Sequence, residues 1–298
     1  MTTLKQRRKR NETWIKYLLS ALATISVLTT LGIIYSLFSE TFVFFQHVSI
    51  VEFFTTLQWS PSLKPQHFGV WPLVVGTAMI AVGSAAVAIP LGLGSAIYLS
   101  EYAKKKTRKV IKPILEVLAG IPSVVYGFFA LTFITPILRD LIPSTKIFNA
   151  ASASIAVGIM IIPLVASLSE DAMNAVPDSM RQGAYALGST RFEVATKVVV
   201  PAALSGIGSA FVLAISRAIG ETMIVAIAAG QSPILTFNPL NSIQTMTGFM
   251  VNVALGDIEY GSIEYQTVFA VGALLFLLTF SLNLVARYIV KKNRETYA

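Results

Sequence analysis

The chain has 298 residues, of which 54% are hydrophobic and 13% are charged. Soluble domains carry about 25% charged residues, so this composition excludes an ordinary water-soluble fold and indicates a chain that resides in a membrane. The net charge of +8 does not indicate nucleic-acid binding, because the basic residues lie in short blocks beside apolar runs. Cysteine is absent, which excludes disulfides and cysteine metal sites, and the two histidines form no metal-binding pattern.

Apolar runs separated by polar connections follow one another along the chain. A basic tail, residues 1–16, precedes an apolar run at 17–38, which we interpret as a retained first helix because no small-residue cleavage site follows it. A bilayer core needs about 20 apolar residues per helix. Further runs of suitable length lie near 70–99, 113–137, 151–169, 206–229 and 265–290. The sequence therefore predicts an all-α integral membrane protein with six transmembrane helices.

Lysine and arginine are concentrated in alternate connections. Nineteen of the 23 lie in the N-terminal tail, between Lys104 and Lys112, between residues 181 and 197, or after residue 286. Cytoplasmic connections carry the excess of positive charge, so we expect both termini, including the tail 291–298, in the cytoplasm.

Two long connections then fall outside the cell. The external loop 39–69 carries aromatic residues and prolines, which suit either a docking loop or a solvated connection with interfacial anchors. The segment 230–261 is rich in Asn, Pro, Ser, Thr and Gly. It is either a solvated loop or a segment that folds partway back into the protein.

Arg217 and Glu221 interrupt an apolar run that otherwise spans the bilayer. Four residues apart on a helix, they would share one face, where they would form either a structural ion pair or part of a polar pathway. An arginine fork donates two parallel hydrogen bonds and keeps its charge, which favours an oxyanion over a cation. We expect Glu221 to keep binding weak enough for release, and Ser123, Tyr126, Ser216 and Thr222 to be further path-lining candidates.

The polar segment that begins at Glu170 is predicted to be cytoplasmic. It reads as a short helix that stops at Gly188, followed by a cap at Ser189 or Thr190 and a second helix. Its small residues would allow close approach of a partner, although an ordinary solvated helical hairpin has the same composition.

Three motifs then give the chain a resemblance to a known family. The EAA loop of bacterial ABC importer permeases is resembled by Arg181–Arg191 together with Val198–Pro201. The chain departs from that pattern at Gly183, where the family often has Glu, and at Val200, where Leu is frequent. Leu118–Phe128 and Ser216–Met223 are similar to stretches of PstC-type permeases of the high-affinity phosphate importer. The similarity runs from about residue 68 to the C-terminus.

The resemblance implies the type I ABC importer permease (MetI-like) fold in a bacterial inner (plasma) membrane, with a permease core at 70–290 and a coupling EAA loop at about 170–205. It also implies several partners: a PstA-type permease, a dimer of PstB-type ATPases, an external PstS-type phosphate-binding protein, inorganic phosphate and membrane lipids. The residues expected to couple to the ATPase are Arg181, Gly183, Ala184, Ala186 and Gly188.

No GxxxxGK[ST] sequence occurs, so the chain has no P-loop, and no metalloprotease or Ser/His/Asp motif indicates an enzyme. We expect no cofactor in this chain, with ATP and Mg²⁺ used by the partner ATPase. Alternatives remain: the PstA-type partner, a permease for sulfate or molybdate, a channel or proton-coupled secondary transporter using Glu221, or a regulatory subunit that transports nothing.

Overall fold

The computed structural model describes residues 2–292, with side chains described from Trp14 to Tyr288. Within these residues, five helical segments are long and apolar enough to cross a membrane. The number is six if two helices bent by 72° relative to each other, Arg191–Ala202 and Leu204–Ile219, are taken together as one span. The predicted class, an all-α membrane protein, is confirmed, with five or six spans among the described residues where six were predicted.

The helices are α1 (Thr2–His47), α2 (Ile50–Thr55), α3 (Trp71–Ile97), α4 (Lys105–Gly120), α5 (Ser123–Phe129), α6 (Thr135–Leu141), α7 (Ala150–Asn174), α8 (Asp178–Ala186), α9 (Arg191–Glu193), α10 (Val200–Ala202), α11 (Leu204–Ile219), α12 (Met246–Leu255) and α13 (Ile263–Lys292). Four π-helical turns join or extend them: Tyr98–Tyr102, Ala130–Ile134, Val194–Val199 and Val225–Ala229. The strands β1 (Trp59–Ser60) and β2 (His67–Phe68) pair antiparallel.

Helices α3 and α7 form the centre of the bundle because small residues let their backbones approach closely. A Cβ added at Gly83 of α3 would lie 2.6 Å from Ser154 Oγ of α7, and one added at Gly158 of α7 would lie 2.8 Å from Val87 Cβ. Small residues of this kind favour helix association within a membrane, where packing rather than water exclusion drives contact. Around this pair, α5, α11 and the turn 225–229 complete the central apolar core.

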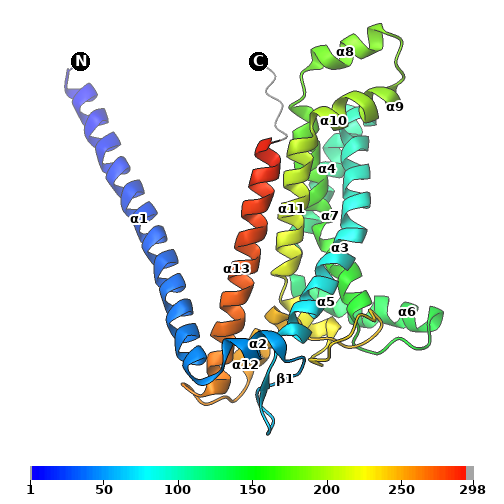
Figure 1. Cartoon of the computed structure of the whole chain (residues 1–298). Helices are drawn as coiled ribbons and strands as arrows, with labels where there is room; N and C mark the ends of the chain where they lie inside the picture. Colours follow the sequence, from blue (N-terminus) through cyan, green and yellow to red (C-terminus); the bar gives the residue numbers. More distant parts are fainter. Residues whose placement is uncertain (1, 293–298) are drawn as a thin grey trace.

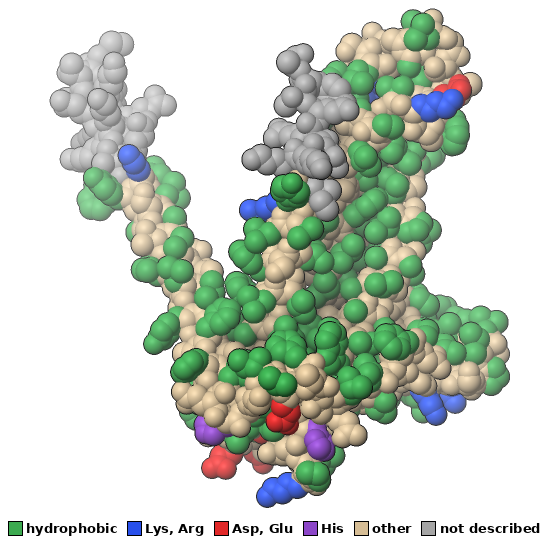
Figure 2. Space-filling model, in the orientation of Figure 1, with side chains coloured by type: hydrophobic (Ala, Val, Ile, Leu, Met, Phe, Trp, Pro, Cys, Tyr) green, Lys and Arg blue, Asp and Glu red, His purple; other side chains and the backbone are tan. Residues whose placement is uncertain are grey.

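The molecule has two ends (Figure 1). The start of α1, the end of α13 and the helix α8 lie at one end, here named the α8 end; β1, α2 and α12 lie at the other, here named the hairpin end. Figure 2 shows hydrophobic side chains along the length of the helices and charged side chains gathered toward both ends. This distribution suits a protein whose middle faces lipid.

Helix α1 diverges from the bundle toward the α8 end (Figure 1). Its apolar side chains are exposed along that part, and none of the most apolar stretch of α1 is buried. Near the hairpin end α1 joins the bundle: Phe38 makes an edge contact with Phe276 of α13, and Phe44 lies fully buried in an aromatic cluster with Phe53 and Phe68. Helix α1 continues beyond residue 38, where the apolar run ends, to His47.

The run 113–137, predicted as one span, is broken. Helix α4 ends at Gly120, and α5 begins at Ser123 after Ile121 and Pro122. A proline has no N–H to donate and disfavours helical backbone in the residue before it, which explains the break. The span is therefore Ser123–Leu141, and α4 is a separate helix without buried side chains.

The segment 230–261 folds back into the protein over residues 243–249, which are buried. The backbone N–H of Met246 donates to Thr77 Oγ1 of α3 at 3.0 Å, and the Thr247 hydroxyl donates to the Glu221 carbonyl at 2.7 Å. Of the two readings offered by the sequence, the re-entrant one is confirmed for these residues.

Candidate translocation site and coupling surface

Arg217 and Glu221 do not share a helix face, so that expectation is wrong. Helix α11 ends at Ile219, and Gly220 caps it. Glu221 lies in the break that follows, where its Oε1 accepts a hydrogen bond from Ile224 N–H at 3.3 Å. Glu221 therefore caps the short helical segment after the break, a role that satisfies otherwise unpaired N–H groups. No ion pair joins it to Arg217 in the described structure.

Arg217 instead lines a cavity of about 190 Å³ between α4, α7 and α11. Its side chain is exposed and makes no ion pair with any described residue. The other residues lining the cavity are Lys112, Leu115, Glu116, Ala119, Met160, Pro163, Leu164, Ser167 and Glu170. Glu221 does not line it. The sequence therefore identified the cation but not its surroundings, because α4 and α11 are brought together only by tertiary packing.

The cavity is bordered by an ion-pair cluster at the end of α7. Glu170 is 1% exposed and pairs with Arg108 Nη2 of α4 through Oε1. Lys112 Nζ lies 3.4 Å from both Glu170 Oε2 and Asp171 Oδ1. A buried carboxylate is costly unless cations balance it, so these pairs hold α4 against α7.

The weaker path-lining candidates are scattered. Tyr126 is buried, and its hydroxyl donates to the Leu118 carbonyl at 2.9 Å, which bridges the break between α4 and α5. The Thr222 hydroxyl donates to the Gly220 carbonyl at 3.1 Å, beside Glu221. Ser123 and Ser216 are half-buried, and neither lines the Arg217 cavity. The structure does not bring these four side chains together around Arg217.

Helix α8 projects from one end of the bundle (Figure 1) and ends in a Schellman motif. Gly188 has φ +85°, its N–H donates to the Tyr185 carbonyl at 3.0 Å, and Ser189 N–H donates to the Ala184 carbonyl at 3.1 Å. A left-handed conformation after the helix is ordinary for glycine and strained for other residues. Thr190 then caps α9 in a reciprocal box with Glu193. The predicted stop and new cap are both present.

The coupling candidates fall into two groups. Gly183, Ala186 and Gly188 are exposed, and no neighbour lies near a Cβ added at Gly183 or Gly188. Ala184 is half-buried against the apolar cluster beneath α8.

Arg181 turns inward rather than toward solvent. Its Nη2 lies 3.1 Å from Glu101 Oε1, and its guanidinium also donates to the carbonyls of Met173 and Val176. Both members of the pair are largely buried, at 15% and 5% side-chain exposure. Arg181 therefore fixes α8 to the ends of α3 and α7.

An exposed apolar patch on and beside α8 was missed by the sequence analysis. Leu187 is 88% exposed, Phe192 68% and Tyr185 42%. Clustered exposed apolar residues mark interaction surfaces. The signal was present in the sequence as large apolar residues within a polar segment predicted to lie outside the membrane.

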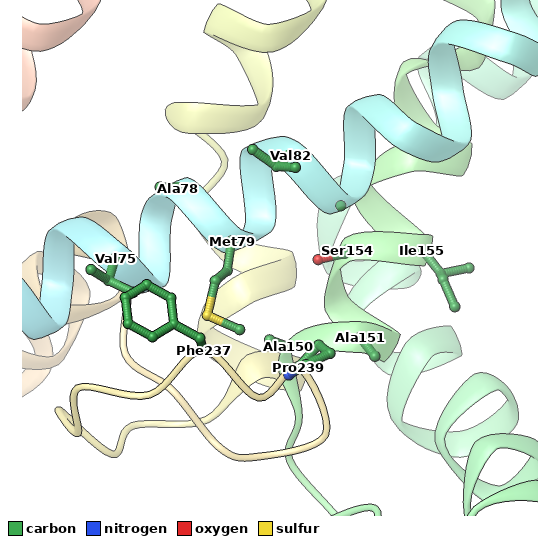
Figure 3. A pocket seen from close by; sticks show the side chains of 11 residues that line it. Val75, Ala78, Met79, Val82, Ala150, Ala151, Ser154, Ile155, Phe237 and Pro239 are labelled. Atoms are coloured by element: carbon green, nitrogen blue, oxygen red, sulfur yellow. The ribbon is translucent and has the colours of Figure 1, made fainter.

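A larger cavity, of about 510 Å³, lies between α3, α7 and the loop that carries Phe237 (Figure 3). Its lining is apolar apart from Ser154: Val75, Ala78, Met79, Val82, Gly83, Ala150, Ala151, Ile155, Phe237 and Pro239. Since no charged side chain lines it, this cavity offers an oxyanion no counter-ion.

Comparisons with known proteins agree with this architecture. The chain is 36% identical to the probable ABC transporter permease protein YqgH of Bacillus subtilis over 83% of this chain and 80% of that protein. It is 30% identical to the phosphate transport system permease protein PstC 1 of Mycobacterium tuberculosis, over 83% of each chain. It is 29% identical to PstC of Haemophilus influenzae over 98% of each chain.

Solved structures show the same fold. A chain from the structure of a bacterial alginate ABC transporter in complex with an alginate pentasaccharide-bound periplasmic protein superposes with a TM-score of 0.68 and 16% identity, covering 94% of this chain and 96% of that one. A chain of the inward-facing MetNI methionine ABC transporter gives a TM-score of 0.56 at 18% identity, covering 76% and 95%.

The model of the family described as "binding-protein-dependent transport system inner membrane component" matches residues 88–295. This range contains α4, the Arg217 cavity, α8 and the break at Gly220. The predicted resemblance to PstC-type permeases is confirmed by the named relatives. The chain therefore belongs to this family of inner membrane transport components and is a multi-pass permease.

Proposed function

We propose that the chain is one of two permease subunits of an ATP-driven importer of inorganic phosphate. Its partners would be a PstA-type permease, a pair of PstB-type ATPases and an external PstS-type phosphate-binding protein. The α8 end would lie in the cytoplasm, where basic connections concentrate. ATP and Mg²⁺ would be bound by the ATPases, and this chain would carry no cofactor.

The observation that carries the proposal is the position of Arg217. It lies at the end of an apolar helix, faces a cavity, and has no carboxylate partner within the described structure. An arginine without an ion pair within a membrane bundle is costly and marks an ion pathway more readily than a packing contact. Its planar fork matches a tetrahedral oxyanion. The PstC relatives support phosphate as that oxyanion.

Glu221 would lie beside this path and fix the backbone conformation of the break after α11. Its carboxylate caps the segment 223–229, and its carbonyl accepts the Thr247 hydroxyl of the re-entrant segment. Thr222 and Ser216 flank the same break at Gly220. A broken helix at membrane depth is tolerated where it lines a cavity or is buried in protein. We assign Glu221 to release of the anion, by setting the shape of the break beside the path.

Coupling to ATP would pass through α8. Gly183, Ala186 and Gly188 expose backbone to a partner, while Leu187 and Phe192 expose large apolar side chains. Arg181 and Ala184 would transmit the displacement of α8 inward, to α3 and to the apolar cluster beneath α8. Rotation of α8 by the ATPase would then shift the end of α7 and, through Glu170, helix α4.

Reconstituted phosphate uptake tests the proposal. The complete complex in proteoliposomes should import phosphate only with ATP, the ATPase and the binding protein, and Arg217→Gln should abolish uptake while the complex still assembles. Uptake without the ATPase would instead identify a channel or secondary transporter. Sulfate or molybdate transport without phosphate transport would identify another oxyanion permease, and assembly without any transport would identify a regulatory subunit.

The ATPase contact has its own test. The chain contains no cysteine, so Leu187→Cys introduces a single reactive thiol on α8. We expect it to crosslink to the ATPase with a short bifunctional reagent. Leu141→Cys, 73% exposed at the end of α6, is the matched control and should not crosslink. Crosslinking of the control alone would contradict the assignment of the α8 end.

A further inference from the structure

The Arg217 cavity contains a second cation, which comes from a different helix. Lys112 of α4 and Arg217 of α11 both line it, together with Glu170 of α7. Three helices distant in the sequence therefore place two positive charges and one buried carboxylate around one space of about 190 Å³. No motif of the sequence indicated Lys112, which lies within a basic block that orientation alone explains.

Lys112 is held loosely by its carboxylate partners. Its Nζ lies 3.4 Å from Glu170 Oε2 and 3.4 Å from Asp171 Oδ1. Charge-assisted N–H···O bonds are about 2.7–2.9 Å long, so both contacts are longer than a strong ion pair. Glu170 Oε2 has no hydrogen-bond donor in good geometry within the described structure. The Lys112 side chain is 33% exposed and has a flexible stem that lets its ammonium reorient.

Arg108 balances the charge of Glu170 independently of Lys112. Arg108 Nη2 contacts Glu170 Oε1 directly, and Asn174 Nδ2 lies 3.5 Å from the same oxygen. Glu170 is 1% exposed and would be strongly destabilising without a cation. Because Arg108 supplies that cation, Lys112 can leave Glu170 without creating an unpaired buried charge.

We propose that Lys112 is a second oxyanion-binding residue, which exchanges Asp171 and Glu170 for the transported anion when that anion occupies the cavity beside Arg217. The proposal rests on the proposed function and adds a residue to its site. Two cations from different helices that line one cavity complement the charge of a tetrahedral oxyanion such as phosphate. The carboxylates of Glu116 and Glu170 in the same lining keep the binding weak, as passage through a site requires.

Phosphate uptake by the complete complex in proteoliposomes tests the role of Lys112. A charge-assisted hydrogen bond contributes about 1.5–3 kcal/mol, so Lys112→Gln should lower uptake at subsaturating phosphate by about tenfold or more. Lys112→Arg, which keeps the charge, should recover most of that loss. Lys109→Gln, an exposed cation on the same helix that does not line the cavity, is the matched control and should transport normally.

Asp171→Asn separates substrate binding from a structural role. It releases Lys112 from one counter-ion, so uptake at low phosphate should be equal to or higher than that of the unaltered complex. If Lys112 only held α4 to α7 through Asp171, Asp171→Asn would reproduce the loss seen in Lys112→Gln, and the double variant would lose no more than either single variant. Either of these results would overturn the proposal. Normal uptake by the Lys112→Gln complex, or failure of that complex to assemble, would also overturn it. Absence of phosphate uptake by the unaltered complex would instead overturn the proposed function.

Discussion

Arg181 of α8 is ion-paired with Glu101 in the π-helical turn that follows α3, with 3.1 Å between Nη2 and Oε1. The pair joins the exposed helix α8 to one of the two central helices of the bundle. Arg181 also donates to the carbonyls of Met173 and Val176, at the end of α7 and just after it. A single side chain therefore connects α8 to both helices of the central pair.

Removing Arg181 should destabilise this junction. Arg181→Ala leaves Glu101 largely buried without its cation and two main-chain carbonyls without their donor, so we expect a loss of about 3 kcal/mol. The melting temperature of the purified complex should fall, and stimulation of ATP hydrolysis by the binding protein should be lost. Arg191→Ala is the control, because Arg191 is exposed and makes no ion pair with any described residue. Equal effects of the two changes would refute the structural role of Arg181.

Alanine substitution of the two glycines of the α8 segment should change stability in opposite directions. Gly188 has φ +85°, so Gly188→Ala should cost about 1–2 kcal/mol, whereas Gly188→Asn should cost less. Gly183 lies inside α8 with no neighbour near its Cβ position, so Gly183→Ala should stabilise α8 by about 0.5–1 kcal/mol. Proteolysis rates within residues 178–191 measure both effects. Faster cleavage of Gly183→Ala than of Gly188→Ala would contradict the assigned end of α8.

The sequence predicted the elements whose signals are local. The apolar runs predicted the five long spans, although one of them begins later than its run, and Gly188 with Thr190 predicted the end of α8 and the cap of α9. The sequence did not predict the features that depend on tertiary packing. Gly220 is a residue type that often ends helices, but apolar residues resume after Thr222, so the run was predicted as one span and not as a helix that ends before Glu221. The hydrophobic periodicity of the sequence does not show which helices contact one another, so the ion pair of Glu170 with Arg108 could not be predicted from it.

Tyr126 should prove structural rather than path-lining. Its hydroxyl donates to the Leu118 carbonyl across the break at Pro122, and its side chain is 6% exposed. Tyr126→Phe removes this hydrogen bond and should lower stability by about 1 kcal/mol. The KM for phosphate should not change, because Tyr126 does not line the Arg217 cavity. A raised KM for phosphate with an unchanged melting temperature would contradict this and indicate that Tyr126 lines the transport path.

The close approach of α3 and α7 provides the last prediction. A Cβ at position 83 would lie 2.6 Å from Ser154 Oγ and 2.7 Å from Ser154 Cβ, which is far inside ordinary contact. Gly83→Ala should therefore force the two helices apart and cost about 1–3 kcal/mol. Gly94→Ala, on the same helix with nothing within 4 Å, is the matched control and should be neutral or slightly stabilising.

A compensating change makes this prediction specific to one contact. Ser154→Gly removes the side chain that the new methyl group would meet, so Gly83→Ala combined with Ser154→Gly should recover most of the lost stability. The melting temperatures of the single and double variants, measured in the same detergent, give the interaction energy between the two positions. Additive effects would mean that the helices do not meet at this pair. A large coupling would establish that Gly83 and Ser154 set the spacing of α3 and α7, the two helices whose far ends receive the Arg181 contacts.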